Sequence, residues 1–131
     1  GVEEKSLLRE SVRHDEVRKL QELATAVLII SRYEGQSMFA IESLSAGAPL
    51  IVAKGTGVED LVEHNMNGFK IDPDDPHSLA EAISQIANAN FQSFRERSKE
   101  IYHAKFDPDR CVEKFLDFVD LSISSNKVDI Y

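Results

Sequence analysis

Short apolar runs that alternate with helix-forming segments constrain the fold of this chain more than any other feature. The runs are residues 26–30 and 50–53, and a third short strand is expected at residues 69–71, where Lys70 stands between two apolar residues. Short, continuously apolar runs are typical of strands that are buried on both faces of a sheet. The expected helices are residues 14–24, 39–46, 58–64, 79–87, 93–104 and 108–121. This alternation predicts an α/β fold, because parallel strands need crossover connections between them.

The chain has 131 residues, which is enough for one modest domain. We expect a partial Rossmann-like domain at residues 1–121, followed by a frayed tail at 122–131. Its layers should be α/β/α, with a short parallel sheet and C-terminal helices. Residues 7–9 are a weak candidate for a further strand. A complete doubly wound domain would have two or three more β/α units before residue 1, so the chain resembles the back part of such a domain.

Composition and simple motifs exclude several classes of function. The net charge of −8 argues against nucleic-acid binding, which needs clustered Lys and Arg. The four histidines show no metal-ligand spacing, so no metal site is expected. The absence of a Gly-x-Gly-x-x-Gly pattern disfavours a dinucleotide site. No signal peptide or apolar run of about 18 residues is present, and we expect a cytoplasmic setting.

The connection after the first apolar run is the candidate binding site. It contains Gly35 and leads directly into the helix expected at 39–46. In α/β sheets ligands bind at the carboxyl ends of strands, and unpaired N–H groups at a helix start favour an anion there. Glu34 precedes the turn and Glu42 lies inside the helix. Two carboxylates around an anion site suit a ligand with hydroxyl groups at both ends and a phosphate between them.

These residues, in this order, resemble a known enzyme family. The pair Glu34 and Glu42, with Tyr33 and Gly35 beside the first, resembles the paired-glutamate signature of retaining glycosyltransferases of the GT-B fold, family GT4 (group 1). The segment 41–51, IESLSAGAPLI, resembles the family's Leu-Glu-Ala-Met-Ala-x-Gly-x-Pro-Val-Ile, and 67–69 resembles its Asn-Gly-Leu. The resemblance runs in register from about residue 12 to about residue 86.

The resemblance implies a C-terminal, donor-binding domain of an enzyme that transfers a sugar from a nucleotide-diphosphate sugar to an acceptor with retention of configuration. It implies no cofactor besides this substrate and no essential metal. By position, Glu42 would bind the ribose hydroxyls and Glu34 would face the transferred sugar as the candidate catalytic residue. The donor-binding residues implied are Glu34, Gly35, Gln36, Ser37, Met38 and Glu42. Backbone N–H groups of Gln36, Ser37 and Met38 would meet the diphosphate and the sugar, and the side chains of Met38 and Phe39 are expected to pack.

The resemblance also implies that the acceptor, a glycan, lipid or small molecule, binds an N-terminal domain outside this segment. This chain alone should therefore be inactive, and any contact with the inner face of a membrane would come from parts outside it.

The chain departs from the family pattern at two places, which leaves an alternative function open. Gln36 and Ser37 stand where the family usually has Phe-Gly, and Lys54 stands where it often has Asp. The alternative is a non-catalytic, GT-B-like binding or interaction module, which could form a dimer through an exposed sheet edge.

Overall fold

Three parallel strands form the centre of the molecule. The computed structural model describes residues 5–126, and its strands are β1 (Val27–Ile29), β2 (Leu50–Ala53) and β3 (Gly68–Ile71). They pair in the order β1-β2-β3, with β2 in the middle. The parallel α/β class predicted from the apolar runs is therefore confirmed.

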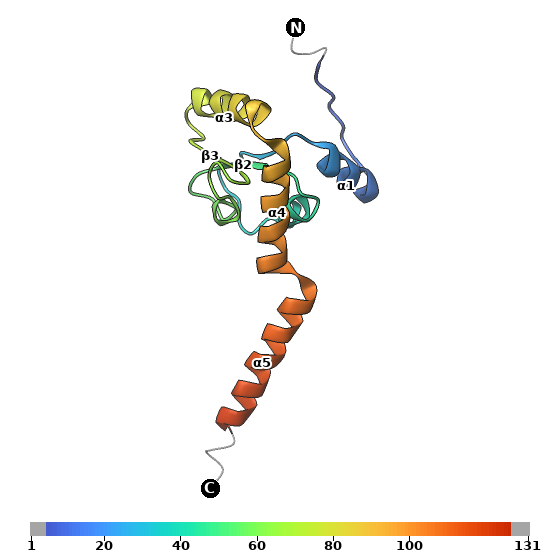
Figure 1. The fold of residues 1–131 in the computed structure, drawn as a ribbon, viewed down its shortest axis with the longest axis vertical. Helices are drawn as coiled ribbons and strands as arrows, with labels where there is room; N and C mark the ends of the chain where they lie inside the picture. Colours follow the sequence, from blue (N-terminus) through green and yellow to red (C-terminus); the bar gives the residue numbers. More distant parts are fainter. Residues whose placement is uncertain (1–4, 127–131) are drawn as a thin grey trace.

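Helices occupy the connections and the C-terminal part of the described chain (Figure 1). Their bounds are α1 His14–Leu23, α2 Met38–Ser45, η2 Glu59–Leu61, α3 Pro76–Asn88, α4 Phe91–Phe106 and α5 Pro108–Asn126. Side-chain caps explain two of the starts: Asp75 accepts from the N–H of His77 before α3, and Asn90 accepts from that of Ser93 before α4. The segment 58–64, expected to be a helix, forms only the 3-10 turn η2.

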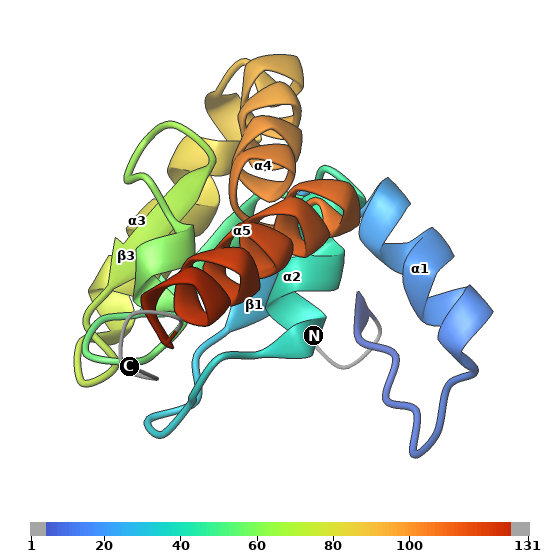
Figure 2. The ribbon, with the colours of Figure 1, turned by 90° about the horizontal axis from the view of Figure 1, so that it is seen from below.

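Both faces of the sheet are covered, so the predicted three-layer α/β/α arrangement is confirmed (Figure 2). Alternate residues of β2 point to opposite faces, as the pleat of a strand requires. Leu50 and Val52 belong to the cluster under α2 and α4, and Ile51 belongs to the cluster under α3. A four-residue strand that is buried along its whole length explains why the run 50–53 has no polar residue.

Helix α1 packs on α2 through a polar contact, although its leucines fall at helical spacing. Leu20 and Leu23 are exposed, whereas Gln21 is buried. Gln21 Nε2 donates to Ser43 Oγ at 3.0 Å, and Ser43 Oγ donates to the Phe39 carbonyl at 2.7 Å. Because α1 reaches the body through α2 and not through the sheet, its leucines have no apolar surface to cover among the described residues.

The C-terminal helix extends away from the body (Figure 1). Its apolar residues Val112, Phe115 and Leu116 are exposed. It ends at Asn126, so residues 122–126 of the expected tail are helical. Residues 127–131 lie outside the described chain, and the domain boundary at residue 121 stays a prediction. Residues 7–9 form no strand.

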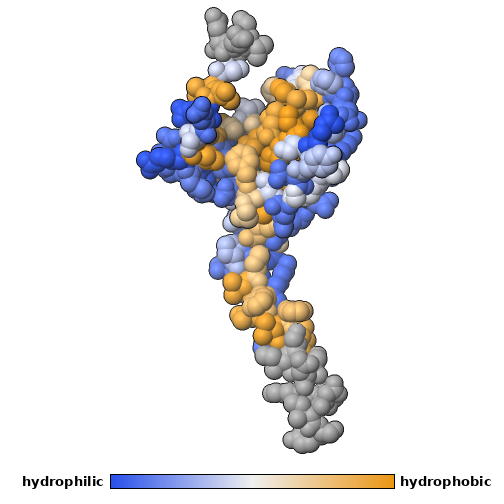
Figure 3. Space-filling view, turned by 180° about the vertical axis from the view of Figure 1, so that it is seen from behind, coloured by the Kyte–Doolittle hydropathy of each residue, from blue (hydrophilic) through white to orange (hydrophobic). Residues whose placement is uncertain are grey.

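The outer edge of β1 borders an apolar groove. Leu28 on β1 is 42% exposed although it pairs with the fully buried Ile51 of β2. A cavity of about 240 Å³ opens here between the strands and α3, and it is lined by Thr25, Ala26, Leu28, Ile51, Ile83, Ile86 and Ala87. Figure 3 shows the apolar surface beside α3 and a second apolar stretch along α5.

Candidate functional site

All six predicted site residues lie in the connection from β1 to α2 or in the first two turns of α2. They are Glu34, Gly35 and Gln36 in the turn, Ser37 at the N-cap, Met38 at the start of α2, and Glu42 in its second turn. The connection leaves the carboxyl end of β1, which is the end where open parallel sheets bind ligands. The structure thus places the residues as one local group.

The start of α2 presents unpaired backbone donors. Ser37 Oγ accepts from the N–H of Ala40 at 3.4 Å, so the serine that replaces the family's glycine serves as the helix cap. Within residues 5–126, no hydrogen bond is shown for the N–H groups of Met38 and Phe39. Such donors, together with the positive end of the helix dipole, favour a negatively charged group.

The side chains around this helix start are more exposed than expected. Met38 is 66% exposed and Phe39 is 42% exposed, so the expectation that both pack in the interior is wrong. Tyr33, in the turn itself, is also exposed. The physical reason is that the helix buries its opposite face, which carries Ala40 and Leu44, against the sheet. The two residues with free N–H groups, Met38 and Phe39, therefore expose apolar side chains.

Glu42 has a partner from α1 that sequence reasoning did not find. His14 Nε2 lies 3.2 Å from Glu42 Oε1, and the side chains are 83% and 33% exposed respectively. The carboxylate is therefore open to solvent on one side and in contact with the start of α1 on the other. Nothing in the sequence around His14 signals this contact, because it depends on how α1 packs against α2.

Glu34 is held through its backbone. Its carbonyl accepts from the N–H of Gly57 at 2.7 Å, across from the loop that follows β2. Next to it, Arg32 forms an ion pair with Asp74, from the loop after β3, at 2.6 Å. Glu34 and Glu42 therefore contact different neighbours: the Glu34 carbonyl contacts Gly57, and the Glu42 carboxylate contacts His14. The roles proposed for both side chains remain predictions.

Other residues of the resemblance have structural roles. Asn67 is fully buried: its Oδ1 accepts from the Glu63 N–H at 2.7 Å, and its Nδ2 donates to the Leu61 carbonyl at 3.0 Å. Gly68 lies against β2, where an added Cβ would overlap the backbone oxygen of Leu50. The Asn-Gly pair therefore closes the loop before β3 and lies outside the β1–α2 connection.

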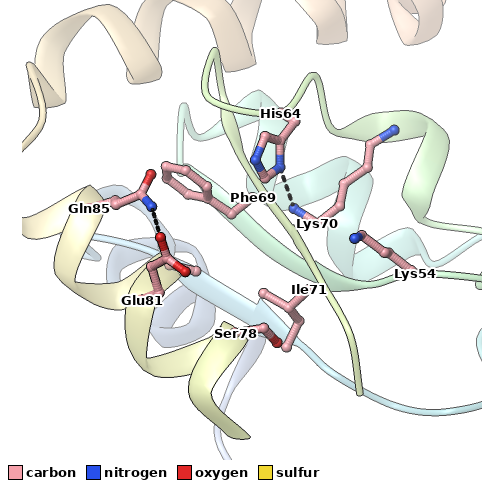
Figure 4. Close-up of a pocket in the computed structure, with 9 residues that line it drawn as sticks. Lys54, His64, Phe69, Lys70, Ile71, Ser78, Glu81 and Gln85 are labelled. Carbon is pink, nitrogen blue, oxygen red and sulfur yellow. Dashed lines mark hydrogen bonds between the residues drawn. The ribbon is translucent and has the colours of Figure 1, made fainter. Parts of the chain in front are cut away.

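A separate cavity of about 200 Å³ lies between β3 and α3 (Figure 4). Its lining includes Lys54, His64, Phe69, Lys70 and Glu81. His64 Nδ1 accepts from the backbone N–H of Lys70 at 3.2 Å, so this ring nitrogen is already in use. No predicted site residue lines this cavity or the groove beside β1.

Two further properties concern the described residues as a whole. No helix among residues 5–126 is long and apolar enough to cross a bilayer. In the same part of the chain, no group of three or more His, Cys, Asp or Glu side chains could hold a metal ion.

Comparison with known proteins links this geometry to a family. The family model of glycosyl transferases group 1 matches residues 1–105. An uncharacterized glycosyltransferase of Methanocaldococcus jannaschii is 31% identical over 86 residues, which are 66% of this chain and 22% of that protein. A D-inositol 3-phosphate glycosyltransferase of Acidothermus cellulolyticus is 24% identical over 116 residues, which are 88% of this chain and 26% of that protein.

A solved structure shares the fold. Sucrose-phosphate synthase from Thermosynechococcus elongatus superposes with a TM-score of 0.77 at 20% identity, over 91% of this chain and 30% of that one. The chain thus spans between a fifth and a third of the length of these relatives. With a family model that covers most of its length and a paired-glutamate connection at the carboxyl end of β1, the chain belongs to the glycosyl transferases group 1 family.

Proposed function

We propose that this chain is the donor-binding part of a retaining glycosyltransferase that takes a sugar from a nucleotide-diphosphate sugar. The family match over residues 1–105 supports the reaction class. The single observation that supports the location of the donor-binding site is the β1–α2 connection, where free N–H groups and Glu42 follow a parallel strand. The diphosphate would accept from the N–H groups of Met38 and Phe39, and Glu42 would accept from the ribose hydroxyls.

In the proposed reaction the bond between the anomeric carbon and the diphosphate oxygen breaks, and the nucleotide diphosphate leaves with the electron pair. The acceptor oxygen forms the new bond to the anomeric carbon on the same face and gives its proton to the departing diphosphate. Glu34, in the turn, would face the sugar and would offset positive charge that develops at the anomeric carbon. A helix start that is already oriented stabilises the leaving phosphate without reorganisation, which is the physical basis for rate enhancement here.

We further propose that the acceptor binds outside this segment and that the isolated chain does not turn over. The exposed edge of β1 and the groove beside it support an interaction at this place, because unpaired strand edges pair readily. In our proposal the edge pairs with further β/α units of the same protein. The competing occupant is the same edge of a second copy. Light scattering of the full-length protein that contains this chain distinguishes these, since only the second case gives a dimer through this edge.

Titration calorimetry with UDP- and GDP-sugars on the full-length protein that contains this chain tests the proposed site. We expect Glu42→Ala to weaken binding of the preferred donor by about tenfold or more, as loss of a charged hydrogen-bond acceptor does. Glu81→Ala is the matched control, because Glu81 lines the cavity beside β3 and is exposed. Loss of binding in Glu81→Ala with normal binding in Glu42→Ala would move the site to that cavity.

The alternative, a non-catalytic interaction module, is not supported by the match to the glycosyltransferase family model. Under this alternative, the wild-type protein binds no nucleotide sugar at all in the same titrations. Binding of either donor class by the wild type argues for the enzyme.

A further inference from the structure

The loop after β2 contacts the candidate donor-binding turn through one glycine. The N–H of Gly57 donates to the Glu34 carbonyl at 2.7 Å. A Cβ atom added at Gly57 would lie 2.8 Å from both the carbonyl carbon and the oxygen of Gly35, and 3.1 Å from the oxygen of Glu34. The backbones of the two loops are therefore in direct contact, with no room for a side chain at Gly57.

This glycine is needed for space and not for its backbone angle. Its φ lies outside the left-handed region, so an alanine could adopt the same backbone conformation. Gly55, two residues earlier, is the opposite case: its φ is +78°, and an added Cβ would meet nothing within 4 Å. In this loop, Gly55 is therefore required by its positive φ, and Gly57 is required because the backbone of the turn 31–36 leaves no room for a side chain.

The loop that carries Gly57 is firmly anchored to the sheet. The N–H of Lys54 donates to the Ile71 carbonyl of β3 at 2.9 Å, and Thr56 Oγ1 donates to the Ala53 carbonyl at 2.7 Å. The next residue, Val58, is fully buried. By contrast, among residues 5–126 no other backbone hydrogen bond joins the turn 31–36 to a different element. Besides the exposed ion pair of Arg32 with Asp74, the anchored loop therefore provides the backbone support of this turn.

We propose that Gly57 is a positioning residue for the donor-binding turn: its N–H and its missing side chain set the place of Glu34 and Gly35 relative to the start of α2. The inference rests on the proposed function. Because Gly57 contacts the backbone of Glu34 and Gly35, an added side chain there would shift the turn that carries two of the proposed donor-binding residues. Misplacement of a binding group by about 1 Å is enough to lose up to a hundredfold in function.

The test compares Gly57→Ala with Gly55→Ala in the full-length protein. We expect Gly57→Ala to raise the KM for the donor sugar nucleotide by about tenfold or more, with the KM for the acceptor unchanged. Gly55→Ala strains the same loop through its positive φ but does not touch the turn, so its donor KM should stay within about twofold of wild type. General destabilisation of the loop would raise the donor KM of both variants, whereas loss of positioning raises it only in Gly57→Ala.

Backbone amide NMR without ligand separates this inference from the proposed function. Gly57→Ala should shift the amide signals of residues 34–37, and Gly55→Ala should not. A folded Gly57→Ala protein with unshifted turn amides or with wild-type donor KM overturns the inference. If the wild type binds no nucleotide sugar, the proposed function and the donor role fail, while the amide shifts still decide whether Gly57 places the turn.

If Gly57→Ala does not fold, hydrogen exchange in the wild type replaces it. Slow exchange of the Gly57 N–H that slows further when UDP- or GDP-sugar is bound supports the inference, and rapid exchange in both states overturns it.

Discussion

Replacement of Asn67 by alanine should destabilise the domain without changing the donor site. The side chain is fully buried, and its two hydrogen bonds, to the Glu63 N–H and the Leu61 carbonyl, close the loop before β3. The alanine leaves both backbone groups without these partners in a site where water has little access. An unsatisfied buried group costs about 1–3 kcal/mol, so the two together should lower the free energy of unfolding by roughly 2–6 kcal/mol.

Urea denaturation followed by far-UV circular dichroism measures this change. A loss of that size should lower Tm by roughly 10 °C or more in a domain of this length. Asn88→Ala is the matched control, because Asn88 is exposed and its Nδ2 donates only to the Ser84 carbonyl of its own helix. The control should stay within about 0.5 kcal/mol of wild type. The reasoning is refuted if Asn67→Ala is equally mild, or if it lowers donor affinity while stability is unchanged.

Two more substitutions test the packing and the charges. Gly68→Ala should cost roughly 3 kcal/mol or more, measured by the same denaturation, because the new Cβ overlaps the backbone of Leu50 and a paired strand cannot move aside as a side chain can. The hydrogen bonds from Arg97 lower the pKa of Glu63 below its ordinary value of 4.5. The pair therefore stabilises the fold above about pH 4.5, and this contribution is lost as the pH falls through the folded-state pKa. Both side chains are more than a third exposed, so solvent screening should keep the effect of this pair on stability small. In Glu63→Gln, unfolding free energy measured from neutral to acidic pH should fall less steeply than in the wild type, and an unchanged profile would contradict the assignment.

The helices and strands that depend on local pattern were predicted well. The run 50–53 became β2 with the expected bounds, since four apolar residues in a row have no solvent-facing side. Helix α2 starts one residue before the expected position, where Ser37 supplies the cap. The expected helix at 58–64 is only the short turn η2, because the loop closed by Asn67 uses the backbone of Leu61 and Glu63.

The candidate site was predicted as a list of residues but not as a set of contacts. Its six members are close in sequence, so the pattern after β1 was enough to group them. Their supports come from elsewhere: His14 reaches Glu42 from α1, and Gly57 reaches Glu34 from the loop after β2. The sequence shows both glycines of that loop. It does not show that Gly55 is needed for its positive φ and that Gly57 is needed because a side chain there would clash with the turn.

The sequence by itself determined the layer architecture, the family and the position of the candidate site in the turn after β1, because apolar periodicity and a spaced motif are properties of neighbouring residues. Only the tertiary structure decided that Gln21 and not Leu20 or Leu23 would be buried on α1, and that Gly57 would support the turn. These outcomes depend on which surfaces meet when the layers pack. Packing brings together residues that are far apart in the sequence, and no local sequence pattern predicts those contacts.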